Sequence, residues 1–463
     1  MKWVAAAVFG LVLAGCAVGP DYKRPELNTP PTFRGAGPET NSLGDSKWWD
    51  VFQDPTLQQL IRIALTNNYD VRIAVDRVEQ AHAIWMENRS QFLPQVNYLG
   101  GVGYGKNVLA NTPFGSGEKA GAGFVGDVNV SWEIDLFGRI RRLNESARAQ
   151  YFATDEARHD VTAAVVTEVA EAYFQLLTLD REWKIACDST NSFGQSLKIF
   201  SERYRGGVAS RLEVVSAQAL MAAAATSALD LQRQITAQED LICVLLGVTP
   251  GPVIRGGASL AQETLPEVPP GLPSALLERR PDVREAEQLV RSANAQVGVA
   301  KADFFPQLTL TGLLGASTSD LATFTAGANR AWEIAAGLTG PIFEGGLLKA
   351  QYRAAQSAAD QAKLQYGQTV LTAFREVADA LSALQRLAEE REEQTSAVAA
   401  YEDAVKLANE RYAHGQANYY EVLQWEQLLF PAETTLAQIQ FNQLQAVVQL
   451  YRALGGGWNE AKK

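Results

Sequence analysis

The sequence predicts a mainly α-helical fold that includes part of a membrane β-barrel, and three observations carry this prediction. The chain of 463 residues contains an internal repeat, with two halves that have the same order of motifs. The segment from Asp127 to Leu136 alternates apolar and polar residues without exception, which is the pattern of a strand with two unlike faces. Two further segments of about sixty-five residues each read as single helices, which are too long for a globular domain to bury.

The composition excludes several classes of function. There are 52 acidic and 41 basic residues, and the net charge is −11, so the chain lacks the excess of positive charge that binds nucleic acid. Three Cys and three His in so long a chain supply neither a disulfide framework nor a soft-metal site. No phosphate loop, nucleophile elbow or paired-His motif is present in the sequence. We therefore expect no nucleic-acid partner, no metal, no cofactor and no catalytic residue.

The N-terminus predicts export and a lipid anchor. A charged start and a short apolar run identify residues 1–15 as a secretory signal. The stretch Leu13-Ala14-Gly15-Cys16 resembles the lipobox of bacterial lipoproteins, which implies that Cys16 carries lipid. Ala17 follows, not the Asp of inner-membrane lipoproteins, so the resemblance implies the outer membrane. The alternative is an ordinary signal peptide beside a Cys. Prolines within residues 16–55 predict an extended tether after the anchor.

Two structural repeats follow, residues 56–262 and residues 263–463. The segment Asp70-Val71-Arg72 returns as Asp282-Val283-Arg284 at an offset of 212, and motifs further along the chain return at an offset of 208. This period is far longer than that of a solenoid, so it indicates a duplicated domain.

Each repeat predicts a helix followed by a β-hairpin. The helices run from Thr56 to Gln91 and from Pro273 to Asp303, and a proline stops each of them. Strands of period two follow, and Gly- and Ser-rich loops at Gly105 to Gly123 and Ser317 to Asn329 join them as hairpins.

A long helical hairpin completes each repeat. Its first helix runs from Arg139 to Tyr204 in the first repeat and from Gly346 to Tyr412 in the second. Each of these helices would be roughly 95 Å long at 1.5 Å per residue. A return helix of about forty residues then ends at glycine, the usual helix stop. Both long helices carry a stripe with steps of 3, 4 and 3, which is typical of helices that pack nearly parallel. The two stripes are Val166, Val169, Tyr173 and Leu176, and Phe374, Val377, Leu381 and Leu384.

The strands predict an oligomer. An apolar face opposite Asp and Glu is stable in lipid only within a closed barrel, and four strands cannot close one. A homotrimer would supply about twelve strands, an even number within the known range. The polar strand faces would then line a lumen that favours cations. The lumen candidates are Asp127, Asn129, Glu133 and Asp135.

Many motifs, in order along the mature chain, resemble the TolC family. They are Trp48-Trp49-Asp50-Val51-Phe52-Gln53-Asp54-Pro55, Arg279-Arg280-Pro281, Phe92-Leu93-Pro94-Gln95, Phe304-Phe305-Pro306-Gln307 and Ile342-Phe343-Glu344-Gly345-Gly346, with paired Arg-Tyr…Gly turns. The lipobox is similar to that of the NodT-type lipoprotein branch. The resemblance implies a TolC-like trimer with a 12-stranded outer-membrane β-barrel, four strands per chain, continuous with a long periplasmic α-helical barrel.

The resemblance also implies the function and the partners. The chain would be the exit duct of a tripartite efflux pump that exports small molecules. Its partners would be a periplasmic membrane-fusion adaptor protein, an inner-membrane RND-type pump and outer-membrane lipid, and it would perform no chemistry. Two alternatives stay open: the exit duct of a type I protein secretion system, and a lipoprotein that spaces the envelope without conducting.

The resemblance places two turns, Arg203 to Ser210 and Arg411 to Asn418, at a periplasmic tip that contacts the adaptor and closes the duct. The candidate residues there are Arg203, Tyr204, Gly207, Glu213, Arg411, Tyr412, Gly415 and Glu421. A simple turn requirement explains the glycines equally well, and the helix dipole explains the two acids at helix starts.

Overall fold

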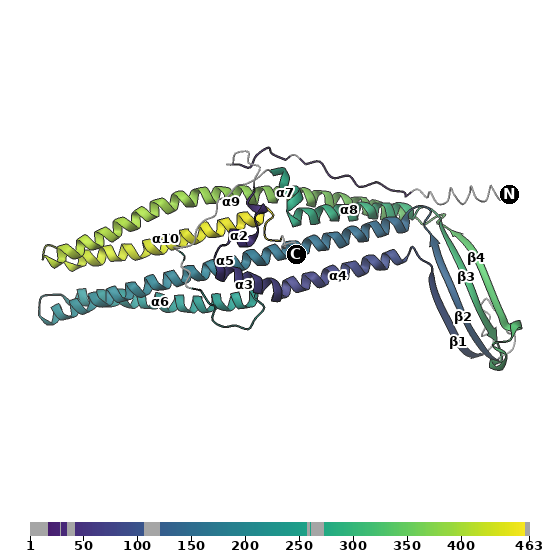
Figure 1. The fold of residues 1–463 in the computed structure, drawn as a ribbon, viewed down its shortest axis with the longest axis horizontal. Coiled ribbons are helices and arrows are strands. Elements are labelled where there is room, and N and C mark those ends of the chain that lie inside the picture. The colour runs from purple at the N-terminus through teal and green to yellow at the C-terminus, as the bar shows by residue number, and fades with distance from the viewer. Residues whose placement is uncertain are drawn as a thin grey trace. The chain divides into compact units, whose positions relative to one another are not determined.

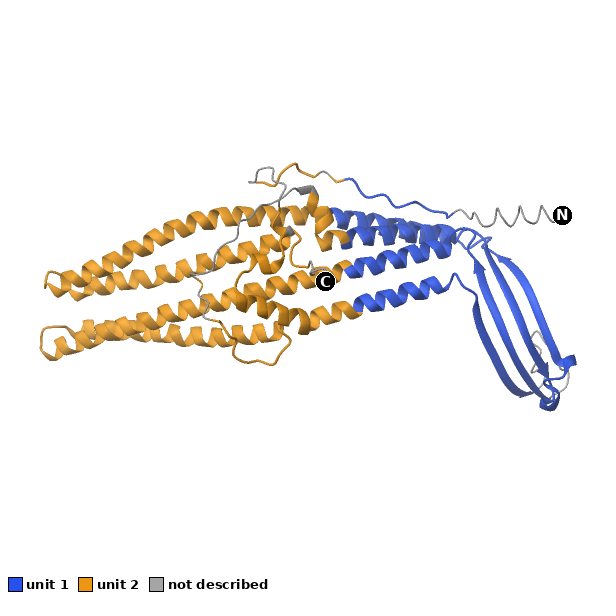
Figure 2. Cartoon of the chain, viewed as in Figure 1, with its two compact units in different colours: residues 1–26, 77–155, 285–367 blue, residues 27–76, 156–284, 368–463 orange. Residues whose placement is uncertain are grey.

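The structure, a computed structural model, describes residues 17–27, 29–34, 42–105, 121–256, 260 and 273–458. The predicted signal, residues 1–15, and the lipid site at Cys16 lie outside the described residues. The chain forms two compact units (Figure 2). Unit 1 comprises Met1–Glu26, Arg77–Asp155 and Glu285–Gly367, and unit 2 comprises Leu27–Asp76, Glu156–Arg284 and Gln368–Lys463. Each unit therefore draws on both sequence repeats.

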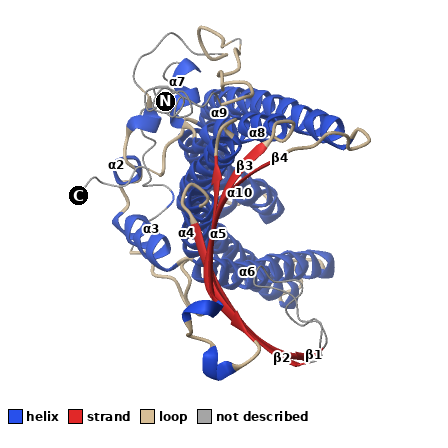
Figure 3. Ribbon diagram, turned by 90° about the vertical axis from the view of Figure 1, so that its right-hand side faces the viewer, coloured by secondary structure: helices blue, strands red, loops and turns tan. Residues whose placement is uncertain are grey.

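A four-stranded antiparallel sheet forms one layer of unit 1 (Figure 3). Its strands are β1 (Gln95–Gly105), β2 (Gly121–Ile134), β3 (Gln307–Thr318) and β4 (Arg330–Thr339). Their order in the sheet is β1-β2-β3-β4. Among the described residues, β1 and β4 each pair with one neighbour, so the sheet has two open edges.

The helices repeat as the sequence does (Figure 1). Helices α5 and α9 both have 67 residues, and α6 and α10 both have 35. The described helices are η1 (Leu43–Asp45), α2 (Trp48–Val51), α3 (Pro55–Asn67), α4 (Tyr69–Ser90), α5 (Arg139–Arg205), α6 (Arg211–Leu245), α7 (Pro273–Arg279), α8 (Pro281–Ala302), η3 (Leu321–Thr323), η4 (Gly327–Asn329), α9 (Leu347–Ala413) and α10 (Tyr419–Ala453).

The first helix of each repeat is broken, which the sequence analysis did not predict. In the first repeat Asn68 leaves the helix, and its side-chain oxygen accepts hydrogen bonds from the backbone N–H groups of Asp70 and Val71. Asn68 therefore caps α4, since an Asn oxygen satisfies N–H groups that have no partner within the helix. In the second repeat the break falls at Arg280, before Pro281, where proline disfavours a helical residue ahead of it.

Arg280 does more than mark the break. Its side chain is buried and forms ion pairs with Asp282 at 2.7 Å and with Glu376 at 2.7 Å. It also donates to the backbone oxygen of Ala453 at 3.2 Å. Asn68, at the matching place of the first repeat, donates to the backbone oxygen of Leu245 in the same way. Both breaks therefore fasten the end of a return helix.

The core of unit 2 is built on the predicted helix stripes. In α5, Val166, Val169, Tyr173 and Leu176 are all fully buried. In α9 only Val377 of the matching stripe is fully buried, and Phe374, Leu381 and Leu384 are partly covered. The stripe of α5 thus lies inside the helix layer, whereas that of α9 is partly uncovered in the single chain.

Side-chain contacts give the order of the long helices in unit 2. Gln238 of α6 donates to the backbone of α5 at 2.9 Å, and Ser192 of α5 donates to Glu426 of α10 at 2.6 Å. Gln394 of α9 donates to the backbone of α10 at 2.8 Å. The order is therefore α6-α5-α10-α9, with α6 and α9 at the two edges.

The described start of the predicted tether lies against unit 1. Residues 17–24 have no helix or strand, as the prolines predict. The backbone N–H of Val18 donates to the carbonyl of Phe137 at 3.0 Å, directly after β2. Asp21 forms an ion pair with the buried guanidinium of Arg142 at 2.7 Å. This stretch is consequently held beside the connection from β2 to α5.

Candidate functional site

The sheet has one apolar face, as the alternation predicts. Residues directly opposite each other on neighbouring strands share a face. The register places Val128 opposite both Tyr98 and Leu314, and Leu314 opposite Trp332. Tyr98 is 87% exposed and Trp332 75% exposed. A broad exposed apolar surface of this kind marks contact with a membrane or a partner. The same face carries Val96, Val102, Tyr104, Val130, Ile134, Leu308, Leu310, Ile334 and Leu338.

The opposite face is mostly polar or small. Asn129 lies opposite Asn97 on β1 and Leu313 on β3, and Leu313 lies opposite Glu333 on β4. The remaining polar members of this face are Gln95, Asp127, Ser131, Glu133, Gln307, Thr309, Thr311, Ser317 and Thr339. One side of the sheet therefore suits lipid and the other suits water.

The four predicted lumen residues have different environments. Asp127 is buried and accepts a hydrogen bond from Asn129 at 3.2 Å. Glu133 is paired with Arg139, which donates to both carboxylate oxygens at 2.9 and 2.6 Å. Both acids thus have partners within the chain.

Asp135 is not a strand residue, since β2 ends at Ile134 and not at Leu136 as predicted. Its carboxylate accepts hydrogen bonds from the backbone N–H groups of Ile140 and Arg141, at 3.3 and 2.9 Å. The free N–H groups at the start of α5 attract this acid, and the strand alternation gives no signal of that competition.

Glu333 is a polar-face acid that the sequence analysis missed. It lies on β4 between Trp332 and Ile334, which point to the apolar face, and its own side chain is exposed. The signal was the same period of two that identified β2. It was harder to see because the small residues Ala331, Ala335 and Gly337 interrupt the polar positions of β4.

The two turns between the long helices have the same geometry. Gly207 and Gly415 have φ angles of 77° and 70°, which glycine adopts at little cost. The N–H of Val208 donates to the carbonyl of Arg203 at 2.9 Å, and in the second turn the N–H of Gln416 donates to the carbonyl of Arg411 at 2.8 Å. This pattern is the Schellman ending of a helix.

The two predicted tip acids are both engaged within their own hairpins. Glu213 forms a capping box with Ser210, in which each residue bonds the backbone N–H of the other. Glu421 forms an ion pair with Arg411 at 2.7 Å. The capping box matches the alternative that Glu213 stabilises a helix start, whereas the ion pair of Glu421 joins the end of α9 to the start of α10.

Near the turns, polar contacts link the first helical hairpin, α5 and α6, to the second, α9 and α10. Arg203 donates to the hydroxyl of Tyr412 at 3.4 Å. Further from the turns, Ser196 and Tyr419 share a buried hydrogen bond of 2.9 Å. Ser192 and Glu426 form the third contact, at 2.6 Å. We call these three contacts the hairpin links. Only Arg203 and Tyr412 were identified from the sequence, because the others belong to no motif and meet only through packing.

Glu426 is an unusual member of the hairpin links. Its side chain is only 6% exposed, and its Oε2 atom has no hydrogen-bond partner among the described residues. Burial raises the pKa of Glu426 above its ordinary value, and the hydrogen bond from Ser192 offsets part of that rise. The matching residue of the first repeat is the neutral Gln218.

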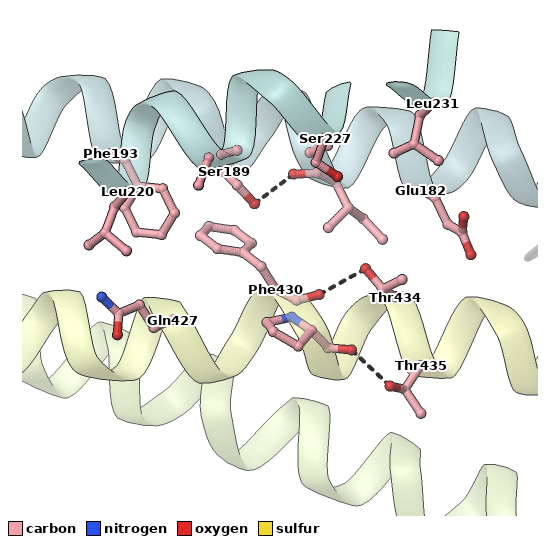
Figure 4. Close-up of a pocket in the computed structure, with 15 residues that line it drawn as sticks. Glu182, Ser189, Phe193, Leu220, Ser227, Leu231, Gln427, Phe430, Thr434 and Thr435 are labelled. Atoms are coloured by element: carbon pink, nitrogen blue, oxygen red, sulfur yellow. Dashed lines mark hydrogen bonds between the residues drawn. The ribbon is translucent and has the colours of Figure 1, made fainter. Parts of the chain in front are cut away.

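A cleft of about 570 Å³ lies beside the hairpin links, between α5, α6 and α10 (Figure 4). Phe193, Leu220, Leu231 and Phe430 give it a mainly apolar lining. Pro431 lies in the same wall, inside α10. Since proline has no N–H, one helical hydrogen bond is missing there.

No metal centre is present among the residues that the structure describes, because no three His, Cys, Asp or Glu side chains are grouped to hold an ion.

Comparison with known proteins gives a consistent result over the whole chain. The sequence model of the family described as outer membrane efflux protein matches residues 60–248 and 272–456. The toluene efflux pump outer membrane protein TtgC of Pseudomonas putida is 32% identical over 99% of this chain and 96% of its own. The probable outer membrane lipoprotein SilC of Salmonella typhimurium is 29% identical over 97% of both chains. The open state of the MtrE outer membrane channel of Neisseria gonorrhoeae is 28% identical, has a TM-score of 0.86, and covers 96% of this chain and 99% of its own.

Proposed function

The chain belongs to the outer membrane efflux protein family, and on that premise we propose that three copies form a closed conduit. The chain is an outer-membrane component of an efflux system, in which an adaptor and an inner-membrane pump are its partners. In our proposal three four-stranded sheets close a barrel of about twelve strands. Small molecules delivered by the pump leave through this barrel, and the chain performs no reaction.

The two unlike faces of the sheet carry this proposal. An exposed face with Tyr98, Trp332 and Ile334 favours lipid, where unpaired backbone groups would cost several kcal/mol each. The open edges at β1 and β4 therefore need partners. A lipoprotein that only spaced the envelope would need neither the apolar face nor the polar one.

We assign the polar face to the lumen. Asp127, Asn129 and Glu133 remain lumen candidates, and Glu333 joins them because it shares their face and is exposed. Asp135 caps α5, so we propose for it a structural role at the mouth of the barrel.

We assign the two turns to the periplasmic end, where they close the conduit and meet the adaptor. The matched Gly207 and Gly415 turns place Arg203 and Arg411 at equivalent positions of the two hairpins. The hairpin links would hold the closed state, since separation of the hairpins must break them. Cys16 would carry the lipid, as the resemblance of Leu13-Ala14-Gly15-Cys16 to a lipobox implies.

Planar-bilayer recording tests the proposal. Purified protein should migrate as an oligomer that heat converts to the monomer, and it should give discrete, cation-favouring current steps. A monomer without such a shift, or an oligomer that never conducts under any opening condition, would refute the conduit. Deletion of the gene should increase sensitivity to small toxic compounds. Loss of an exported protein, with unchanged drug sensitivity, would favour secretion instead.

A further inference from the structure

The cleft between α5, α6 and α10 has one carboxylate and otherwise uncharged walls (Figure 4). Glu182 of α5 supplies the carboxylate, and none of the other described residues that line the cleft is acidic or basic. The volume of the cleft, about 570 Å³, is within the range of roughly 300–1,000 Å³ that is typical of ligand pockets. The cleft is therefore large enough to hold a small organic molecule.

The carboxylate of Glu182 has no partner within the described part of the chain. Its side chain is partly buried, and neither a hydrogen bond nor an ion pair reaches it from another described residue. Burial raises the pKa of Glu182 above its ordinary value, and no described donor or cation opposes that rise. A positive group that entered the cleft would supply the missing partner and stabilise the charged form.

Apolar side chains gather toward the other end of the cleft. The ring of Phe193 on α5 meets the ring of Phe430 on α10 edge to face, with centres 5.7 Å apart. Figure 4 shows Phe193 and Leu220 toward one end of the cleft and Glu182 toward the other. The eleven residues from Glu182 to Phe193 span roughly 16 Å of helix at 1.5 Å per residue. The cleft thus has a charged end and an aromatic end.

The hydroxyl groups in the walls are already bonded within their own helices. Thr434 and Thr435 donate to carbonyl oxygens one turn earlier in α10, at 3.1 and 2.9 Å. Ser189 does the same in α5 at 2.8 Å. These hydroxyls keep oxygens that accept hydrogen bonds, but their hydrogens are not available to a ligand. Since the lining also lacks Lys and Arg, the cleft suits a cation better than an anion.

We propose that this cleft binds a lipophilic cation, a small molecule with an aromatic body and one positive charge. The positive group lies at the carboxylate of Glu182, and the aromatic body lies against Phe193 and Phe430, where ring contacts add to the burial of apolar surface. The inference deepens the proposed function and rests on it, because such a molecule reaches the cleft through the conduit.

The cleft lies on the face of α5 that turns away from the N-terminal helices. Tyr173 donates to Asp54, directly before α3, at 2.6 Å. Phe174 contacts Phe52, directly after α2, with ring centres 6.3 Å apart. Glu182 follows Tyr173 by nine residues, which is about 180° around a helix of 3.6 residues per turn. Three copies of the layer that contains α2 and α3 would fill the inside of a ring, so this layer lies outside the conduit and the cleft faces the lumen.

The second repeat lacks the apolar floor of the cleft. A shift of 208 residues converts Ile185 and Ala186 into Glu393 and Gln394. The fold therefore does not require an apolar surface at this place on the long helix. The same shift converts Glu182 into Glu390, which is exposed on α9 and does not line the cleft. Glu390 consequently provides a matched control for Glu182.

Fluorescence titration with ethidium tests the site. Ethidium is a flat aromatic cation with a permanent charge, and its emission rises when water is excluded. The purified parent oligomer is compared with Glu182→Gln and Glu390→Gln at one detergent concentration, so that uptake of the dye by micelles is the same in all samples. We expect Glu182→Gln to weaken binding about fivefold, as for the loss of one partly exposed charge pair. Glu390→Gln should bind the dye as the parent does.

A filled cleft provides the second comparison. Ser227 is exposed and lies in the α6 wall of the cleft, so Ser227→Trp fills the space without removing a buried contact. This variant should lose binding at the site, and Ser227→Ala should keep it. Equal binding by the parent and Glu182→Gln, or parental binding by Ser227→Trp, would overturn the site.

Single-channel recording of the same preparations separates this inference from the proposed function. A parent oligomer that conducts but binds no more ethidium than Glu182→Gln would overturn the inference alone. A parent oligomer that binds ethidium in the cleft but never conducts would overturn the proposed function, and the cleft would then be a ligand site without a role in export.

Discussion

Removal of two hairpin links should open the periplasmic end of the conduit. Ser192→Ala removes the only described donor to the buried carboxylate of Glu426, at 2.6 Å. A hydrogen bond to a charged group contributes about 1.5–3 kcal/mol. Tyr419→Phe removes the hydroxyl that meets Ser196 at 2.9 Å, a contact between neutral groups of about 0.5–1.5 kcal/mol.

The double variant should therefore weaken the coupling of the two hairpins by about 2–4.5 kcal/mol. Each 1.4 kcal/mol is a factor of ten, so the equilibrium should move at least about thirty-fold toward the open state. The assay is single-channel recording in a planar bilayer, in which the open fraction should rise steeply. Sensitivity of cells to a large antibiotic, normally excluded by the outer membrane, should rise in parallel.

The neighbouring Tyr420 provides the control for this experiment. It is 62% exposed, and Tyr420→Phe should leave the open fraction unchanged. Thermal stability of the oligomer must stay close to that of the parent protein, so that opening is not confused with unfolding. An intact double variant that conducts like the parent would refute the role of the links in closure.

Three further outcomes are expected. The buried carboxylate of Glu426 destabilises the folded protein increasingly as pH rises from the ordinary pKa range of Glu through the raised pKa of the buried group. Glu426→Gln removes this cost, so the melting temperature of the variant should exceed that of the parent above this pH range and equal it in acid. Parallel curves of melting temperature against pH would contradict this. Glu333→Gln should reduce cation selectivity more than Glu133→Gln, because the charge of Glu133 is already balanced by its ion pair with Arg139. Equal shifts of the reversal potential in the two variants would show that this ion pair is absent in the assembled channel. Gly207→Ala should destabilise the turn by about 1–2 kcal/mol from backbone strain alone, since a Cβ there would meet nothing within 4 Å and φ is 77°; an unchanged melting temperature would show that the turn adopts another conformation.

Features set by local periodicity could be predicted from the sequence. The two long helices start at or within one residue of the predicted positions. The alternation in β2 correctly separates an apolar from a polar face across all four strands. Turn glycines at 207 and 415 were identified from the repeat, and both have positive φ angles.

Features set by competition or by packing could not be predicted. Asp135 continues the alternation of β2 but caps α5, since free N–H groups bind a carboxylate more strongly than the strand pattern indicates. Asn68 breaks a helix that its neighbours favour, because its side chain bonds both α4 and the end of α6. The pairing of Ser192 with Glu426 joins residues that are far apart in the chain, and no local pattern records it.

Cysteine accessibility along β2 tests most directly whether the sheet spans the membrane around a water-filled lumen. Single cysteines at Val128, Asn129, Val130 and Ser131 alternate between the two faces. Each variant is made in protein whose Cys187 and Cys243 are replaced by Ser. In intact outer membranes that carry these variants, a small water-soluble maleimide should label positions 129 and 131, and a lipid-soluble reagent should label positions 128 and 130. Equal labelling of all four positions by the water-soluble reagent would contradict a membrane-spanning sheet with one face in lipid and the other in water.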